Sequence, residues 1–118
     1  MASVEIKSID KAQVRAAADE WAACLLQRRP DIAEIVVFGS FEQDTYVPGS
    51  DLDVFILLER AEKPVHERIP DLMPKRFPVG MDVFPYTCEE VSARAPSPIL
   101  DAVNRSTWRY TRGGARSA

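Results

Sequence analysis

The chain is poor in the residues that build thiolate metal sites, disulfide frameworks and membrane segments. It has two cysteines and one histidine in 118 residues. Cys24 and Cys88 lack a zinc-type spacing, so we expect two reduced, partly buried thiols. No apolar run approaches the roughly 18 residues that span a bilayer. The N-terminal segment also lacks the apolar core of a signal peptide. We therefore expect a cytoplasmic protein without membrane contact.

The chain also has no excess of positive charge. Fifteen Lys and Arg face eighteen Asp and Glu, which gives a net charge of −3. Such a chain is not expected to bind duplex nucleic acid through the phosphate backbone. The composition, 46% hydrophobic and 28% charged, is ordinary for a globular protein,. The length predicts a single domain over residues 1–118 with a disordered tail over 112–118.

The hydrophobic pattern predicts a small α/β fold, in the broad α+β sense, with a mixed sheet of three or four strands covered by helices. A helix capped by Ser8 or Asp10 is expected to run to about Arg28 and to bury Cys24. Strands are expected at 32–38, 53–58 and 79–85, with a short edge strand at 108–110. Further helices are expected after Ser40, Thr87 and Ser97, the last with Ile99 facing inward. Pro70 and Pro74 interrupt the helical spacing in the segment 59–78, so a kinked helix or two short turns are expected there.

Two aspartates open the second predicted strand. Side chains alternate along a strand, so Asp51 and Asp53 should point the same way, with Cα atoms about 7 Å apart. Carboxylates this close repel each other unless a cation lies between them. Hard oxygen ligands favour Mg²⁺ or Mn²⁺ over zinc. The pair therefore indicates a divalent metal site.

A third aspartate, Asp82, lies within the third predicted strand among apolar residues. Burying a carboxylate there is costly without a partner. If the two strands are neighbours, Asp82 can reach the ions held by Asp51 and Asp53. The Gly39-Ser40 turn would then offer backbone amides to phosphate oxygens. Two ions, three carboxylates and an anion-binding turn suit in-line phosphoryl or nucleotidyl transfer.

This set of motifs resembles a known family. Gly39-Ser40, ten residues, Asp51-Leu52-Asp53 and a later Met81-Asp82-Val83 strand are similar to the DNA polymerase β-like nucleotidyltransferase superfamily, above all to its minimal stand-alone members. The resemblance implies that Asp51 and Asp53 bind two Mg²⁺ ions that grip a nucleoside triphosphate. It implies that Asp82 completes the second ion site and helps to deprotonate the acceptor hydroxyl. Gly39 and Ser40 would hold the β- and γ-phosphates, with Ser50 also in the nucleotide-binding set.

The same resemblance implies a function. The chain would move a nucleotide monophosphate from a nucleoside triphosphate, expected to be ATP, to a hydroxyl and release pyrophosphate. In some minimal members the acceptor is a tyrosine on a small helical HEPN-type toxin, and the nucleotidyltransferase acts as its antitoxin. A HEPN-type partner is therefore expected here. A homo-oligomer is also compatible with the sequence.

The chain departs from the family pattern after Gly39-Ser40. Relatives usually continue with arginines, whereas this chain continues with Phe41-Glu42-Gln43-Asp44. The departure supports an alternative, in which a catalytically weak or inactive relative acts as a binding module that masks a partner protein. A drug-modifying enzyme or a template-directed polymerase is less favoured, because the chain is short for an added acceptor domain. Two interpretations stay open for the arginines beyond Asp101: a solvated face, or a contact for an acidic partner. The residues are Arg105, Arg109, Arg112 and Arg116.

Overall fold

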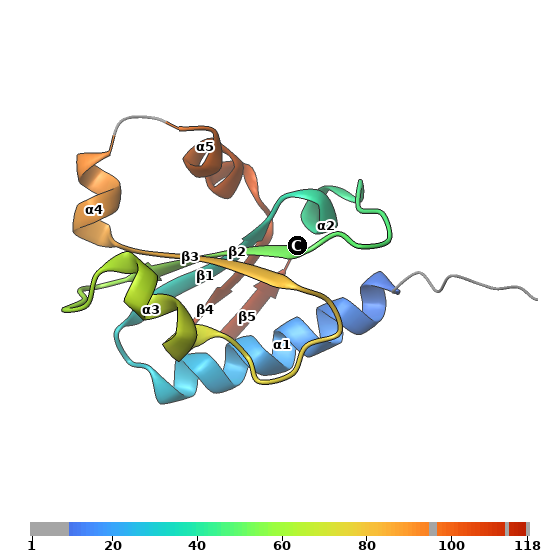
Figure 1. Ribbon diagram of the computed structural model, residues 1–118, viewed down its shortest axis with the longest axis horizontal. Coiled ribbons are helices and arrows are strands. Elements are labelled where there is room, and N and C mark those ends of the chain that lie inside the picture. Colours follow the sequence, from blue (N-terminus) through green and yellow to red (C-terminus); the bar gives the residue numbers. More distant parts are fainter. Residues whose placement is uncertain (1–9, 95–96, 113, 118) are drawn as a thin grey trace, which may run out of the picture.

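The computed structural model describes residues 10–94, 97–112 and 114–117. Ser8, one of the two predicted caps, lies outside these residues. Helices and strands alternate through most of the chain (Figure 1). The elements are α1 (Lys11–Arg28), β1 (Ile32–Phe38), α2 (Ser40–Gln43), β2 (Leu52–Leu58), α3 (Val65–Leu72), β3 (Met81–Thr87), α4 (Cys88–Ala93), α5 (Pro98–Arg105), β4 (Trp108–Thr111) and β5 (Gly114–Ser117).

The strands form one mixed sheet in the order β3-β2-β1-β4-β5. Strands β2 and β3 are parallel, and the other neighbouring pairs are antiparallel. The predicted α/β class with a mixed sheet is confirmed. The sheet has five strands, one more than the predicted maximum. The additional strand is β5, which occupies part of the tail that we expected to be disordered and moves β4 away from the edge.

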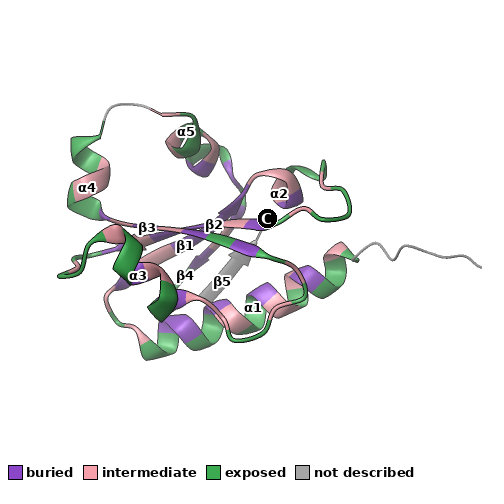
Figure 2. Cartoon of the chain, in the orientation of Figure 1, coloured by how far each residue is buried: buried purple, intermediate pink, exposed green. Residues whose placement is uncertain are grey.

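Helices cover both faces of the sheet (Figure 1). Helices α1 and α3 lie on one face, where a large apolar cluster joins them to alternate residues of the strands. Helices α4 and α5 lie on the opposite face over a smaller cluster built from Val36, Phe38, Phe55 and Val103. Figure 2 shows that the buried residues gather along the strands and the inner side of α1. Alternation along β2 therefore separates two environments: Val54 and Ile56 face α1, and Phe55 faces α4 and α5,.

Three helices, α1, α4 and α5, begin with the predicted capping chemistry. Asp10 caps α1, and its side chain accepts a hydrogen bond from the Ala12 amide at 3.1 Å. Thr87 and Glu90 form a complete capping box at the start of α4. Ser97 caps α5 through its side chain, which accepts from the Leu100 amide. Each cap satisfies amides that have no partner inside the helix. In the segment 59–78 a single helix forms, α3, with Pro70 inside it.

Three local expectations were wrong. Cys24 and Cys88 are free but exposed, because Cys24 lies on the outer side of α1 and Cys88 opens α4. Ile99 is 37% exposed rather than inward-facing. Ser40 is the first residue of α2 and not its cap; Gly39 is the N-cap and makes no side-chain hydrogen bond. A single apolar residue on a short helix does not determine which side of that helix packs.

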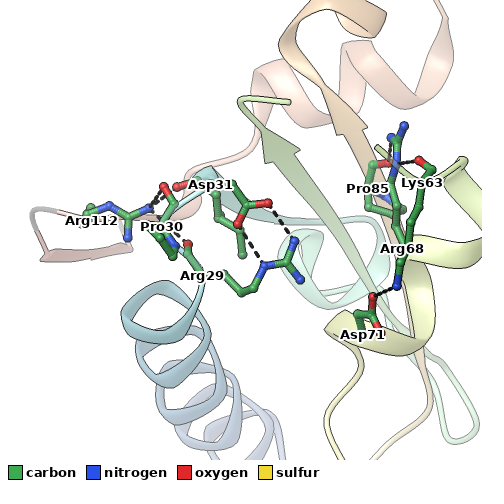
Figure 3. A network of polar contacts seen from close by, with 9 residues as sticks. Arg29, Pro30, Asp31, Lys63, Arg68, Asp71, Pro85 and Arg112 are labelled. Atoms are coloured by element: carbon green, nitrogen blue, oxygen red, sulfur yellow. Dashed lines mark hydrogen bonds and ion pairs between the residues drawn. The ribbon is translucent and has the colours of Figure 1, made fainter. Parts of the chain in front are cut away.

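Arginine side chains tie loop backbone to the body of the domain (Figure 3). Arg112 donates to the backbone carbonyls of Leu26, Pro30 and Ile32, so it holds the α1–β1 connection. The buried Arg68 donates to the carbonyls of Lys63 and Pro85. These contacts give Arg112 a structural role and remove it from a freely available basic face. Arg109, paired with Glu34, is occupied in the same way.

Candidate functional site

The three predicted aspartates meet at one end of the sheet. Asp51 directly precedes β2, Asp53 is the second residue of β2, and Asp82 is the second residue of β3. The parallel register pairs Asp53 with Asp82 as direct neighbours. Because Met81 and Val83 face α1, alternation places Asp82 on the face of α4 and α5, together with Asp53,. The two strands are therefore neighbours, which is the condition that the expected three-aspartate site required.

The surroundings of Asp82 differ from the expectation. We expected a carboxylate that is costly to bury among apolar side chains. Instead Asp82 and Asp51 are exposed, and only Asp53 is partly buried. The difference arises because α4 and α5 do not cover the start of β3, which is an edge strand. The carboxylates are therefore accessible from solvent at the end of the sheet.

Gly39 lies against one of these carboxylates. Strand β1 runs antiparallel to β2, with Phe38 opposite Asp53, so β1 ends where β2 begins. Gly39 has φ 84° and ψ −152°, a conformation that is open almost only to glycine,. A Cβ atom at this position would lie 2.4 Å from Asp53 Oδ2. Glycine is thus required twice, by the backbone and by the close approach of the carboxylate.

Gly80, which is not among the predicted site residues, also lies against a carboxylate. A Cβ atom on Gly80 would lie 2.3 Å from Asp51 Oδ1. The Gly80 carbonyl also accepts a hydrogen bond from the Leu52 amide at 2.9 Å, which joins the starts of β2 and β3. The only signal in the sequence is a glycine directly before an aspartate-bearing strand. Gly39 and Gly80 therefore flank the carboxylates on two sides.

Negative charge accumulates at this end of the sheet. Burial raises the pKa of the Asp53 carboxyl, and the nearby Asp82 and Asp51 raise it further,. Within the described part of the chain, none of the three carboxylates has a hydrogen-bond or ion-pair partner. Their repulsion is therefore not compensated by a side-chain cation that the structure describes. This is the electrostatic setting that a bound cation would relieve.

The side chains as they stand do not form a finished ion cage. Within residues 10–94, 97–112 and 114–117, no three His, Cys, Asp or Glu side chains are arranged to hold one metal ion. The donor chemistry nevertheless fits Mg²⁺, since three unpaired carboxylates on neighbouring backbone positions supply the hard oxygen ligands that this ion prefers. Asp51 and Asp82 are exposed, and rotation of their side chains would alter which oxygens converge.

The loop between α2 and β2 holds the remaining predicted site residue. Ser50 Oγ accepts a hydrogen bond from the Val47 amide at 2.9 Å, and the Ser50 amide donates to the Val47 carbonyl. These bonds fix a turn directly before Asp51. Ser50 therefore positions the loop that carries the first aspartate.

The acidic residues of α2 and its C-terminal cap are engaged elsewhere. Asp44 forms an ion pair with Lys11 at the start of α1, 33 residues away in sequence. Glu42 accepts a hydrogen bond from the Thr107 amide at 3.3 Å. This acidic segment stands where relatives usually carry arginines. The ion pair with Lys11 reduces the opposition that Asp44 would offer to a phosphate.

A family model supplies the deciding comparison. The model of the nucleotidyltransferase domain matches residues 19–96, about two thirds of the chain. The chain belongs to the nucleotidyltransferase domain family. The matched segment contains β1, α2, β2, α3, β3 and α4. Every residue of the predicted site therefore lies within the nucleotidyltransferase domain, whose members generally use a nucleoside triphosphate and a divalent metal ion.

The fold comparison agrees. The chain resembles the crystal structure of a candidate nucleotidyltransferase from Sulfolobus solfataricus. The TM-score is 0.58 at 19% sequence identity, and the match covers 90% of this chain and 87% of the other. At this identity the likeness shows the fold alone. No curated protein matches the chain. No helix among the described residues is long and apolar enough to cross a membrane.

Proposed function

We propose that the chain transfers a nucleotide monophosphate from a nucleoside triphosphate, ATP, to a hydroxyl acceptor, and that Asp51, Asp53 and Asp82 carry the reaction. The observation that supports this most is the direct pairing of Asp53 and Asp82 across β2 and β3, beside the close approach of Gly39. Family membership supplies the reaction class. The three aspartates supply the ligands for two Mg²⁺ ions.

The turn after β1 is suited to the phosphates. Gly39 has no side chain in the space that lies next to the Asp53 carboxylate. A triphosphate that shares metal ions with Asp53 would therefore lie close to the backbone of Gly39 and Ser40. Backbone amides at such a turn donate to phosphate oxygens. Ser50 contributes by holding the loop that positions Asp51.

The proposed reaction is one in-line displacement. The acceptor oxygen forms a bond to the α-phosphorus, and the bond from the α-phosphorus to the bridging oxygen of the β-phosphate breaks. Pyrophosphate leaves, and the acceptor proton passes to the Asp82 carboxylate and then to water. Bound Mg²⁺ would neutralise charge on the phosphates. Asp82 is suited to receive the proton because it is exposed on the outer strand, where an acceptor can approach.

For the acceptor we propose a tyrosine on a small helical HEPN-type protein, whose toxicity the modification would remove. The exposed position of Asp51 and Asp82 supports an acceptor that arrives on another molecule. The masking alternative has one specific observation in its favour: α2 carries no basic residue beside the phosphate turn. In that case the chain would bind the partner without modifying it.

Transfer of label from α-³²P-ATP to a co-purified partner tests the proposal. We expect Mg²⁺-dependent labelling of the partner, an added nucleotide monophosphate in its mass spectrum, and loss of both with Asp82→Ala. Asp101→Ala, which removes an exposed aspartate of α5, is the matched control and should retain labelling. A stable complex whose partner stays unlabelled would support masking and contradict the transferase proposal.

A further inference from the structure

An aromatic row continues from the candidate site along the sheet. On β3 the face that carries Asp82 also carries Phe84 and Tyr86, because alternate residues share a face,. On β2 the same face carries Phe55 after Asp53. The Phe84 Cα lies about 7 Å from that of Asp82, two residues along the strand. Aromatic rings thus begin one step from the carboxylates.

These rings differ in how far their faces are already covered. Phe55 is 3% exposed and Phe38 is 6% exposed, so neither can take a ligand. Tyr86 stacks on Phe55 at 6.0 Å, and the Arg94 guanidinium covers its ring at 4.3 Å. Phe84 is partly buried, and its ring contact is a tilted one with Phe38, 5.6 Å between centroids and 57° between planes. Among these four rings Phe84 combines exposure with proximity to the aspartates.

Phe84 lies on the side of the aspartates where the base of a bound nucleotide is expected. If the α-phosphate lies at the three aspartates and the other phosphates lie toward Gly39, the triphosphate runs from β2 toward β1. The base is separated from the α-phosphate by the ribose alone. The Phe84 ring, one step beyond Asp82 on the same face, would then be within reach of this flat aromatic group. Bases stack readily on aromatic side chains because every base has a π-face.

We propose that Phe84 is the base-stacking residue of the nucleotide site. This inference rests on the proposed function, since it requires a triphosphate at the aspartates. Stacking tolerates any base and strengthens with ring area, so purine triphosphates should bind more tightly than pyrimidine triphosphates. Adenine and guanine should differ little on this contact.

NMR titration of the full chain with Mg²⁺ and two ligands tests the inference. One ligand is a non-hydrolysable ATP analogue, and the other is inorganic tripolyphosphate, which has the phosphates without a base. We expect Phe84→Leu to weaken the analogue about tenfold and to leave tripolyphosphate unchanged. Phe84→Trp keeps an aromatic face and should bind the analogue at least as well as the native chain.

Tyr86→Leu is the matched control, because Tyr86 carries the next ring on the same face of β3. The Arg94 guanidinium already covers this ring. Tyr86→Leu should leave both affinities unchanged. An unchanged analogue affinity in Phe84→Leu, or equal weakening of both ligands, would overturn the inference while leaving the proposed function standing. If neither ligand binds the native chain, the proposed function itself fails, and the inference with it.

Discussion

Replacing Gly39 by alanine tests the geometry of the site most sharply. The backbone conformation of Gly39, with φ 84° and ψ −152°, costs a non-glycine residue roughly 1–3 kcal/mol,. The new Cβ would also lie 2.4 Å from Asp53 Oδ2 and 3.3 Å from Asp53 Cγ. Rotation of the carboxylate relieves the first contact, but the second requires the side chain to move. We expect the free energy of unfolding to fall by about 2–3 kcal/mol, a loss of roughly 10 °C in melting temperature.

Two other glycines separate strain from contact. Gly49 has φ 94°, but no atom of the described residues lies within 4 Å of an added Cβ, so Gly49→Ala reports strain alone. Gly80→Ala reports contact without a positive φ, since its Cβ would meet Asp51 Oδ1. Urea denaturation of Gly39→Ala in the native and Asp53→Ala backgrounds completes the design. We expect the alanine to cost about 1 kcal/mol less when Asp53 is absent. An equal cost in both backgrounds would refute the contact between Gly39 and the Asp53 carboxylate.

Three further predictions concern charge. The pKa of Asp53 is raised in the folded state, so its ionisation opposes folding at pH values above that pKa. The opposition decreases as pH falls through the folded pKa and is gone below the unfolded pKa,. At neutral pH and without metal, Asp53→Asn should therefore melt at a higher temperature than the native chain. Millimolar Mg²⁺ should raise the melting temperature of the variant less than that of the native chain. Equal increases in thermal melts would contradict a metal site at Asp53. Arg68 and a capping amide lower the pKa of Glu90 to about 2, so this stabilisation is present above pH 4.5 and is lost as pH falls toward 2. The free energy of unfolding of Glu90→Gln should be about 1–2 kcal/mol lower than that of the native chain at pH 7. In urea titrations this difference should shrink as pH falls from 4.5 toward 2. A difference that stays constant with pH would argue against the Arg68–Glu90 pairing. Because α2 has no basic residue, Gln43→Arg should tighten ATP binding about tenfold, or 1.4 kcal/mol, from a native dissociation constant of about 1 mM,. Calorimetry with a non-hydrolysable ATP analogue measures this affinity. An unchanged affinity would show that α2 does not face the phosphates.

The central part of the fold could be predicted because its signals are local. Two apolar runs bounded by Gly39 and Asp51 define β1 and β2, and the period of two places Asp53 and Asp82 on one face. Their direct pairing then required only that β2 and β3 be neighbours. The capping box at Thr87 was also predictable, since a few adjacent residues of sequence contain all of its chemistry.

The parts that were not predicted depend on distant contacts. Strand β5 is a short segment with a glycine at one end and a serine at the other, and it forms by pairing with β4 rather than by any pattern of its own,. The Lys11–Asp44 ion pair joins residues that are 33 positions apart. The exposure of Asp82 follows from the edge position of β3, which sequence periodicity cannot give. The single-domain boundary at 1–118 and the roles of Gly39, Ser40, Ser50 and the three aspartates stay predictions.

A crystal of the full chain soaked with Mn²⁺ and a non-hydrolysable ATP analogue shows directly whether the aspartates bind the metal and the nucleotide. Mn²⁺ accepts the oxygen ligands that Mg²⁺ prefers, and its anomalous scattering locates the ion independently of the density for the nucleotide. We expect a peak between the carboxylates of Asp53 and Asp82, about 2.1 Å from their oxygens, with the phosphates extending toward Gly39. Nucleotide bound at another part of the sheet, or Mn²⁺ away from these carboxylates, would contradict the proposed site.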